Sequence, residues 1–127
     1  LAGLLSEDHR SFRVTEELMY ASTEVVENKF TGNTTIGVII TNAKFEKSAL
    51  CKIAGMAHDG YARSIRPVHT TADGDSIYAV STGEILADQD LVGTLAAEVM
   101  SEAIIKAVKS AESAYGYPGY REVIYGE

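Results

Sequence analysis

The sequence is poor in the residues that mark several common protein classes. It has one cysteine, Cys51, and no tryptophan. A single cysteine excludes an internal disulfide framework, and its position near the apolar stripe of a predicted helix favours a small buried side chain over a nucleophile. No apolar run reaches the roughly 18 residues that a membrane-spanning helix needs. The 46% apolar content fits a single soluble core.

Basic residues are also scarce. Eleven Lys and Arg stand against eighteen Asp and Glu, which gives a formal net charge of −7 over 127 residues. Because no Lys/Arg cluster interrupts this acidic balance, nucleic acid and anionic membranes are poor candidate partners. The first residues, Leu1 to Leu5, lack both the basic region of a signal peptide and an initiator Met. We therefore expect a cytoplasmic chain that is either processed or a piece of a longer one.

Apolar periodicity predicts two long helices. The first runs from about Glu46 to Arg66, and Pro67 marks its end. The second is predicted to start with Asp90 as N-cap and to run to about Tyr115, with Gly116 as its stop. A shorter helix is predicted around Val14 to Val26, where β-branched residues lower the helix propensity.

Two strands are predicted, each followed by one of the long helices. They are Thr35 to Thr41 and Ser76 to Thr82, and the linker-like stretch Asn28 to Asn33 precedes the first. The order strand, helix, strand, helix predicts an α/β layer in which both helices cover one face of the sheet. Two strands make a poor sheet, and the long Ala-rich helix has more apolar surface than they can cover. A missing partner explains this surplus.

Each strand is preceded by a polar motif. Gly32-Asn33-Thr34-Thr35 places a hydroxyl between a flexible turn and a buried strand, which is how a self-cleaving hydrolase stores its nucleophile. The same pattern is common where ordinary strands begin. Asp73-Gly74-Asp75 precedes the second strand and is predicted to hold two carboxylates beside Thr34, although an ordinary solvated turn has the same sequence. The residues around it do not supply the alternating oxygen ligands of a calcium loop.

The histidines offer little by spacing alone. His9, His58 and His69 show no metal-ligand pattern, and Ser/His/Asp triads can be drawn on almost any chain of this size. We therefore predict ordinary structural histidines, with no metal and no cofactor.

Several motifs, in order, resemble one hydrolase family. They are Asn33 to Val38, Thr41 to Ala43, Met56 to Arg63, Pro67 to Thr70, Asp73 to Asp75 and Ser81 to Gly83. Together they are similar to the C-terminal part of the family that contains the L-aminopeptidase/D-esterases, the β-peptidyl aminopeptidases and the endo-type nylon-oligomer hydrolases. The resemblance covers roughly Gly32 to Arg121.

The resemblance implies an N-terminal nucleophile enzyme made as an inactive precursor. The precursor is expected to cut itself between Asn33 and Thr34, so that Thr34 becomes a chain terminus whose α-amine activates its own hydroxyl. Asp73 and Asp75 are expected to lie beside Thr34 and to fix its hydroxyl and ammonium. A Thr nucleophile with two Asp resembles the nylon-oligomer hydrolases more than the aminopeptidases, which tend to have Ser with a Ser/Glu pair.

The family also implies what surrounds this chain. Its precursors are longer, and their N-terminal part supplies a Lys and an Asn to the catalytic centre. Residues 1–33 are then the tail of the larger segment, and residues 34–127 are the smaller, nucleophile-bearing segment of the same domain. The implied fold is a four-layer α/β/β/α sandwich that assembles into homo-oligomers and acts on peptides or small amides.

Two alternatives stay open at this point. One is an acyltransferase resembling the ornithine acetyltransferases, which use a self-released N-terminal Thr to pass an acyl group to an amine. The other is a non-catalytic module in which the two motifs are only turns at strand ends. The second alternative predicts no chain break and no effect of Thr34→Ala beyond stability.

Overall fold

The computed structural model describes residues 2–24 and 32–126. These residues belong to two compact units. One unit is drawn from Leu1–Val25 and Ala103–Glu127, and the other from Val26–Glu102. Most of the predicted linker, Asn28 to Asn33, lies outside the described residues. Both polar motifs belong to the second unit, which is therefore the unit that bears on function.

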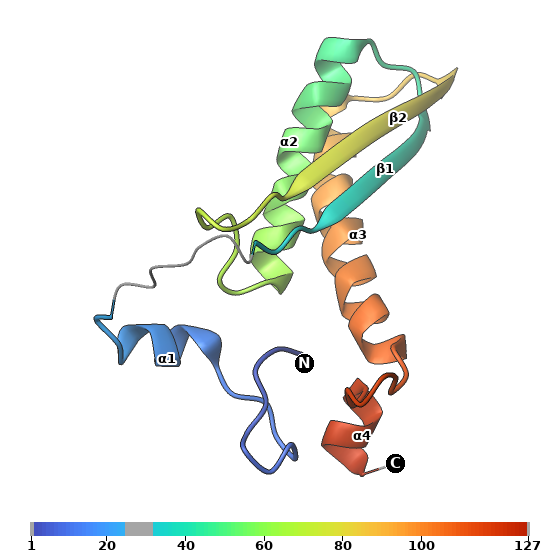
Figure 1. Cartoon of the computed structure of the whole chain (residues 1–127). Helices are drawn as coiled ribbons and strands as arrows, with labels where there is room; N and C mark the ends of the chain where they lie inside the picture. Colours follow the sequence, from blue (N-terminus) through green and yellow to red (C-terminus); the bar gives the residue numbers. More distant parts are fainter. Residues whose placement is uncertain (1, 25–31, 127) are drawn as a thin grey trace. The chain divides into compact units, whose positions relative to one another are not determined.

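The second unit is built on one strand–helix–strand motif. Strand β1 (Ile36–Ala43) leads into helix α2 (Lys47–Ser64), which returns the chain to strand β2 (Ser76–Ile85). The two strands pair in parallel, with Ile36 opposite Ser76 and Thr41 opposite Ser81, before an irregularity that brings Ala43 opposite Ile85. A parallel pair needs such a crossover. The predicted α/β class is confirmed (Figure 1).

Helix α3 (Gln89–Ser110) joins α2 on one face of this sheet. The contact is close because glycines stand where the elements meet. A Cβ on Gly37 of β1 would lie 2.7 Å from both Met100 Cε of α3 and Tyr61 Oη of α2. A Cβ on Gly60 of α2 would lie 2.5 Å from the carbonyl oxygen of Ala97 in α3. The prediction that both helices cover one face is confirmed (Figure 1).

The opposite face of the sheet is apolar and open. Its side chains alternate along both strands, as the strand period of two requires. They are Ile36 (68% exposed), Val38 (54%), Ile40 (73%), Tyr78 (62%) and Val80 (48%). Helix α3 also exposes Leu91, Leu95 and Val99, which recur every four residues. The predicted surplus of apolar surface is thus confirmed within the second unit.

Helix α3 differs from its predicted bounds at both ends. It begins at Gln89 because the Asp88 side chain, rather than that of Asp90, accepts a hydrogen bond from the Leu91 N–H at 2.9 Å. It ends at Ser110, before the predicted Tyr115. Gly116 therefore does not stop the helix: it has φ 85° and lies in a turn in which Ala114 and Tyr117 exchange backbone hydrogen bonds.

The first unit contains two short helices. Helix α1 (Thr15–Tyr20) is shorter than the predicted segment, whose last residues, Val25 and Val26, lie outside the described part. Helix α4 (Tyr120–Tyr125) was not predicted from periodicity, because six residues are too few to establish one; Gly126 at φ 71° ends it. In the described segments, no helix has both the length and the apolarity needed to cross a membrane.

One prediction about a side chain is wrong. Cys51 is exposed rather than buried. The buried stripe of α2 runs through Ile53, Ala57 and Tyr61, at steps of four. Cys51 is two residues before Ile53, which places it about 200° around the helix and away from the core.

Candidate active site

The two polar motifs lie side by side just before the strands that they lead into. Asn33 and Asp73 form an isolated parallel bridge, and the Gly74 N–H donates a hydrogen bond of 2.9 Å to the Asn33 carbonyl. The Ser76 N–H then donates to the Thr35 carbonyl, also at 2.9 Å. The parallel pairing of β1 and β2 is therefore what brings the hydroxyl motif and the carboxylate motif together.

Thr34 lies directly over Gly74. A Cβ on Gly74 would lie 2.8 Å from Thr34 Oγ1, which is closer than real Cβ contacts. Gly74 thus supplies the space that the Thr34 hydroxyl occupies. Thr34 itself is exposed. Sequence reasoning treated Gly74 only as a spacer between carboxylates, although a glycine between two functional residues is a signal for close approach.

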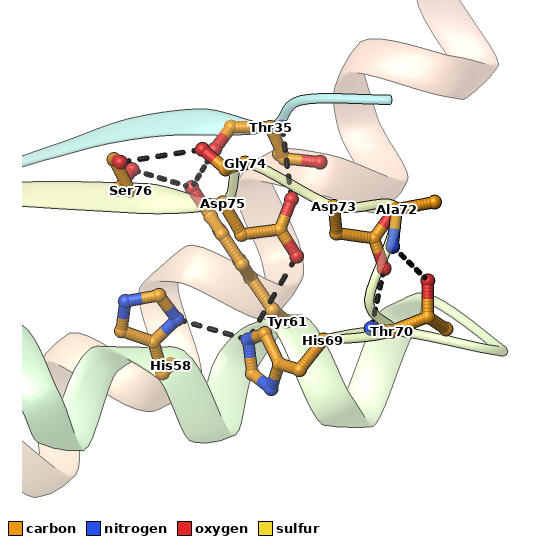
Figure 2. A network of polar contacts seen from close by, with 10 residues as sticks. All are labelled: Thr35, His58, Tyr61, His69, Thr70, Ala72, Asp73, Gly74, Asp75 and Ser76. Carbon is orange, nitrogen blue, oxygen red and sulfur yellow. Dashed lines mark hydrogen bonds and ion pairs between the residues drawn. The ribbon is translucent and has the colours of Figure 1, made fainter. Parts of the chain in front are cut away.

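Asp75 is a buried carboxylate with one oxygen in use. Its Oδ1 accepts a hydrogen bond of 3.0 Å from the backbone N–H of Thr35, the residue after Thr34 (Figure 2). Its side chain is only 6% exposed, and Oδ2 has no hydrogen-bond partner. The imidazole Nε2 of His69 lies 3.9 Å from that oxygen, within ion-pair distance.

Asp73 faces its own loop instead. Its Oδ2 accepts a hydrogen bond of 2.6 Å from the Thr70 N–H, and its own N–H donates to the Thr70 carbonyl at 3.1 Å (Figure 2). In the part of the chain that the structure describes, neither Asp73 nor Asp75 has a hydrogen bond with the Thr34 side chain. That both carboxylates hold the Thr34 hydroxyl and ammonium stays a prediction. What is observed is that each carboxylate binds a backbone amide.

Tyr61 extends from helix α2 to the start of both strands. This fully buried side chain places its hydroxyl 3.3 Å from the Thr35 carbonyl and 3.2 Å from the Ser76 carbonyl, one on each strand (Figure 2). Burial raises the pKa of the Tyr61 hydroxyl above its ordinary value, and the negative charge of Asp75 raises it further. The hydroxyl is therefore a neutral donor that bridges the two strands beside Thr34.

Two histidines that spacing did not connect are in contact. His58 Nδ1 of α2 lies 2.9 Å from Nε2 of His69, which is in the loop before β2 (Figure 2). Their rings meet edge to face, with centroids 4.9 Å apart. Both lie in motifs that carried the family resemblance, which was the available signal. Among the residues described, no group of three or more His, Cys, Asp or Glu side chains is arranged to hold a metal ion.

Comparison with known proteins places the chain among hydrolases. The sequence model of Peptidase family S58 matches residues 5–122. Similar proteins include an uncharacterized aminopeptidase of Mycobacterium tuberculosis (strain ATCC 25618 / H37Rv), 37% identical over 74% of this chain and 32% of its own length. An uncharacterized aminopeptidase of Mycobacterium leprae (strain TN) is 40% identical over 69% of this chain and 28% of its own length. A 6-aminohexanoate-oligomer endohydrolase of Kocuria sp. (strain KY2) is 35% identical over 61% of this chain and 26% of its own length.

The class of protein follows from these matches, because both the matching family and the named relatives are hydrolases of peptide or amide bonds. The chain belongs to Peptidase family S58. The resemblance found in the sequence motifs is thereby confirmed. The chain spans about a third or less of the length of the relatives that it matches.

Proposed function

We propose that this chain carries the nucleophile of a self-processing amidohydrolase, and that Thr34 is that nucleophile. The observation that supports this most is the setting of the Asn33–Thr34 peptide. Its carbonyl oxygen accepts the Gly74 N–H at 2.9 Å, and the hydroxyl of the next residue lies over the same glycine. The carbonyl to be attacked and the attacking hydroxyl are thus both positioned by Gly74.

The proposed self-cleavage has two steps. Thr34 Oγ1 attacks the Asn33 carbonyl carbon, and the C–N bond breaks as the amide becomes an ester. Water then hydrolyses that ester, which gives a carboxylate on Asn33 and a free amine and hydroxyl on Thr34. Negative charge develops on the Asn33 oxygen during the attack, where the Gly74 N–H already donates a hydrogen bond.

Once freed, Thr34 acts on a substrate amide. Its α-amine, with a reference pKa of about 7.7 to 8.0, accepts the hydroxyl proton near neutral pH, which an amide nitrogen cannot do. The hydroxyl attacks the substrate carbonyl, the leaving amine takes up the proton, and water hydrolyses the resulting ester. Asp75 fixes the backbone next to the nucleophile through the Thr35 N–H, with Asp73 closing the adjoining loop.

A segment outside this chain completes the proposed enzyme. The open apolar face of β1 and β2 suits a second sheet, and the chain accounts for about a third of the length of its relatives. We therefore propose the four-layer α/β/β/α sandwich, with the Lys and Asn of the catalytic centre supplied by the preceding segment. Residues 1–33 would end that larger segment, and residues 34–127 would form the smaller one in a cytoplasmic homo-oligomer.

Peptides or small amides are the proposed substrates. The relatives named as aminopeptidases and as 6-aminohexanoate-oligomer endohydrolases both point to amide bonds, with water as the acceptor. This favours a hydrolase over an acyltransferase. An assay with an acyl donor and a competing amine separates the two, because a hydrolase releases the free acid even when the amine is present.

The test is a set of three variants in the full-length protein. Thr34→Ala is expected to abolish amide hydrolysis, a loss of about 10⁴-fold or more in kcat, because the nucleophile is absent. Thr34→Ser retains a hydroxyl and is expected to stay active. Thr35→Val is the matched control, since the Thr35 contacts at the site are made by its backbone N–H and carbonyl. Retained hydrolysis by Thr34→Ala would refute the proposed nucleophile.

A further inference from the structure

We propose that His69, held in place by His58, is a positioning residue for Asp75 and, through the Thr35 amide, for Thr34. This inference rests on the proposed role of Thr34. It assigns a task to two histidines that spacing alone predicted to be ordinary. The groups form a chain of contacts in which His58 contacts His69, His69 faces Asp75, and Asp75 binds the backbone N–H of Thr35 (Figure 2).

The first observation is the unused oxygen of Asp75. Oδ2 is buried without a hydrogen-bond partner, while Oδ1 holds the Thr35 N–H. A buried carboxylate oxygen with no partner is costly, so such a group needs a nearby donor or positive charge. Of the described residues, His69 is the basic residue within ion-pair distance, with Nε2 at 3.9 Å. A shift of less than about 1 Å would bring that nitrogen into hydrogen-bond range.

The second observation is that His69 is held against helix α2. Its side chain is 40% exposed, so burial does little to fix it. His58 compensates with the 2.9 Å contact between its Nδ1 and His69 Nε2. The His58 ring in turn packs edge to face on Tyr61, with centroids 5.2 Å apart. Each ring in this series is thus oriented by a more buried one.

The third observation is the backbone at His69. Its φ of 55° lies in the left-handed region, which a residue with a side chain adopts at a cost. The loop before β2 retains this conformation at the residue that faces Asp75. The residue with the strained backbone, His69, is therefore also the residue that faces the unpartnered oxygen of Asp75.

These contacts give the histidine pair a defined task. The His69 Nε2 faces both His58 Nδ1 and Asp75 Oδ2, so a proton on it can be directed to either atom. Directed to Asp75, the hydrogen on Nε2 holds the second oxygen of the carboxylate. Asp75 then has both oxygens fixed, and the backbone on the carboxyl side of Thr34 keeps one orientation.

The experiment compares histidine variants in the full-length protein. His69→Ala is expected to lower kcat about ten- to hundredfold, the range for one lost hydrogen bond to a charged group, with KM changed less than about twofold. His69→Gln, whose amide nitrogen reaches a position similar to Nε2, is expected to recover most of the loss. His9→Gln is the matched control, because His9 is exposed and also has a positive φ of 58°.

A double variant tests whether His58 acts through His69. The His58→Ala/His69→Ala pair is expected to be no slower than His69→Ala alone, because His58 has no partner to orient once His69 is gone. Independent roles would instead multiply the two losses, and that result would overturn the proposed order.

The outcomes also separate this inference from the proposed nucleophile. An unchanged kcat in His69→Ala, together with an inactive Thr34→Ala, overturns the positioning role and leaves Thr34 in place. An active Thr34→Ala overturns the proposed function itself. If His69→Ala is not recovered folded, two other variants decide. A kcat close to that of wild type in His69→Gln, with a reduced kcat in His58→Ala, supports the role. A loss of about tenfold or more in His69→Gln, or a wild-type kcat in His58→Ala, overturns it.

Discussion

At the residue scale, the hydrogen bonds around Thr34 are made to the backbone on either side of it rather than to its hydroxyl. Gly74 donates to the carbonyl before it, Asp75 accepts from the amide after it, and Tyr61 donates to the carbonyl of Thr35. Together these contacts hold the backbone on both sides of the nucleophile. The hydroxyl itself stays exposed, as a nucleophile that must meet a substrate requires.

Tyr61 gives a prediction that depends on pH. Its folded-state pKa is raised, so ionisation favours the unfolded chain. The stability that its neutral form contributes is complete below the unfolded value of about 10 and is lost as pH rises through the folded value. Tyr61→Phe is expected to lower the free energy of unfolding by about 0.5 to 1.5 kcal/mol at pH 7. Between pH 7 and pH 11, the variant is expected to lose less stability than the wild-type protein, because it has no hydroxyl to ionise at this position.

Denaturant unfolding of the full-length protein at both pH values measures this difference. Tyr115→Phe is the control, because Tyr115 is 99% exposed and its removal is expected to change neither value. If wild type and Tyr61→Phe lose equal stability between pH 7 and pH 11, the Tyr61 hydroxyl is not held as a buried neutral donor.

Sequence reasoning found the residues of the two motifs but not the residues that support them. Thr34 and Asp75 stand out because they precede strands. His58 and His69 are eleven residues apart in the sequence, one in a helix and the other in a loop. No local periodicity predicts their contact. Cys51 is exposed because it lies close in sequence to the apolar stripe of its helix but on the opposite side of the helix.

At the scale of the elements, glycines set the distances within the second unit. Gly60 lets α2 approach the backbone of α3, and Gly37 lets both helices approach β1. These contacts fix where Tyr61 meets the strands. The helices and strands themselves were predictable from their periods of about 3.6 and 2, whereas the true start of α3 was not, because Asp88 and Asp90 are equally good N-cap residues by type.

Two glycines of the same helix give a matched pair of predictions. Gly60→Ala is expected to destabilise the full-length protein by about 1 to 3 kcal/mol, because the new Cβ would meet the Ala97 carbonyl oxygen at 2.5 Å. Gly55→Ala has nothing within 4 Å of its new Cβ and is expected to stabilise by about 0.4 to 1 kcal/mol. Thermal unfolding of both variants checks this, and changes of the same sign would contradict the close packing described.

On the scale of the whole molecule, the second unit has a covered face and an open one. The open face carries Val38 and Ile40 from β1 with Tyr78 and Val80 from β2, all about half exposed or more. Contiguous apolar surface of this kind marks an interaction site, and the proposed second sheet would cover it. The sequence predicted this surplus from composition and strand count. The covering sheet was implied only by the family resemblance, because its residues lie outside this chain in the proposed enzyme.

The most direct measurement of the central claim is the intact mass of the full-length protein under denaturing conditions. We predict two chains, of which the smaller begins at Thr34, and a single uncut chain for Thr34→Ala. Terminal sequencing of the smaller chain locates the break between Asn33 and Thr34. An unbroken Asn33–Thr34 bond in a preparation that hydrolyses amides at full rate would contradict the account.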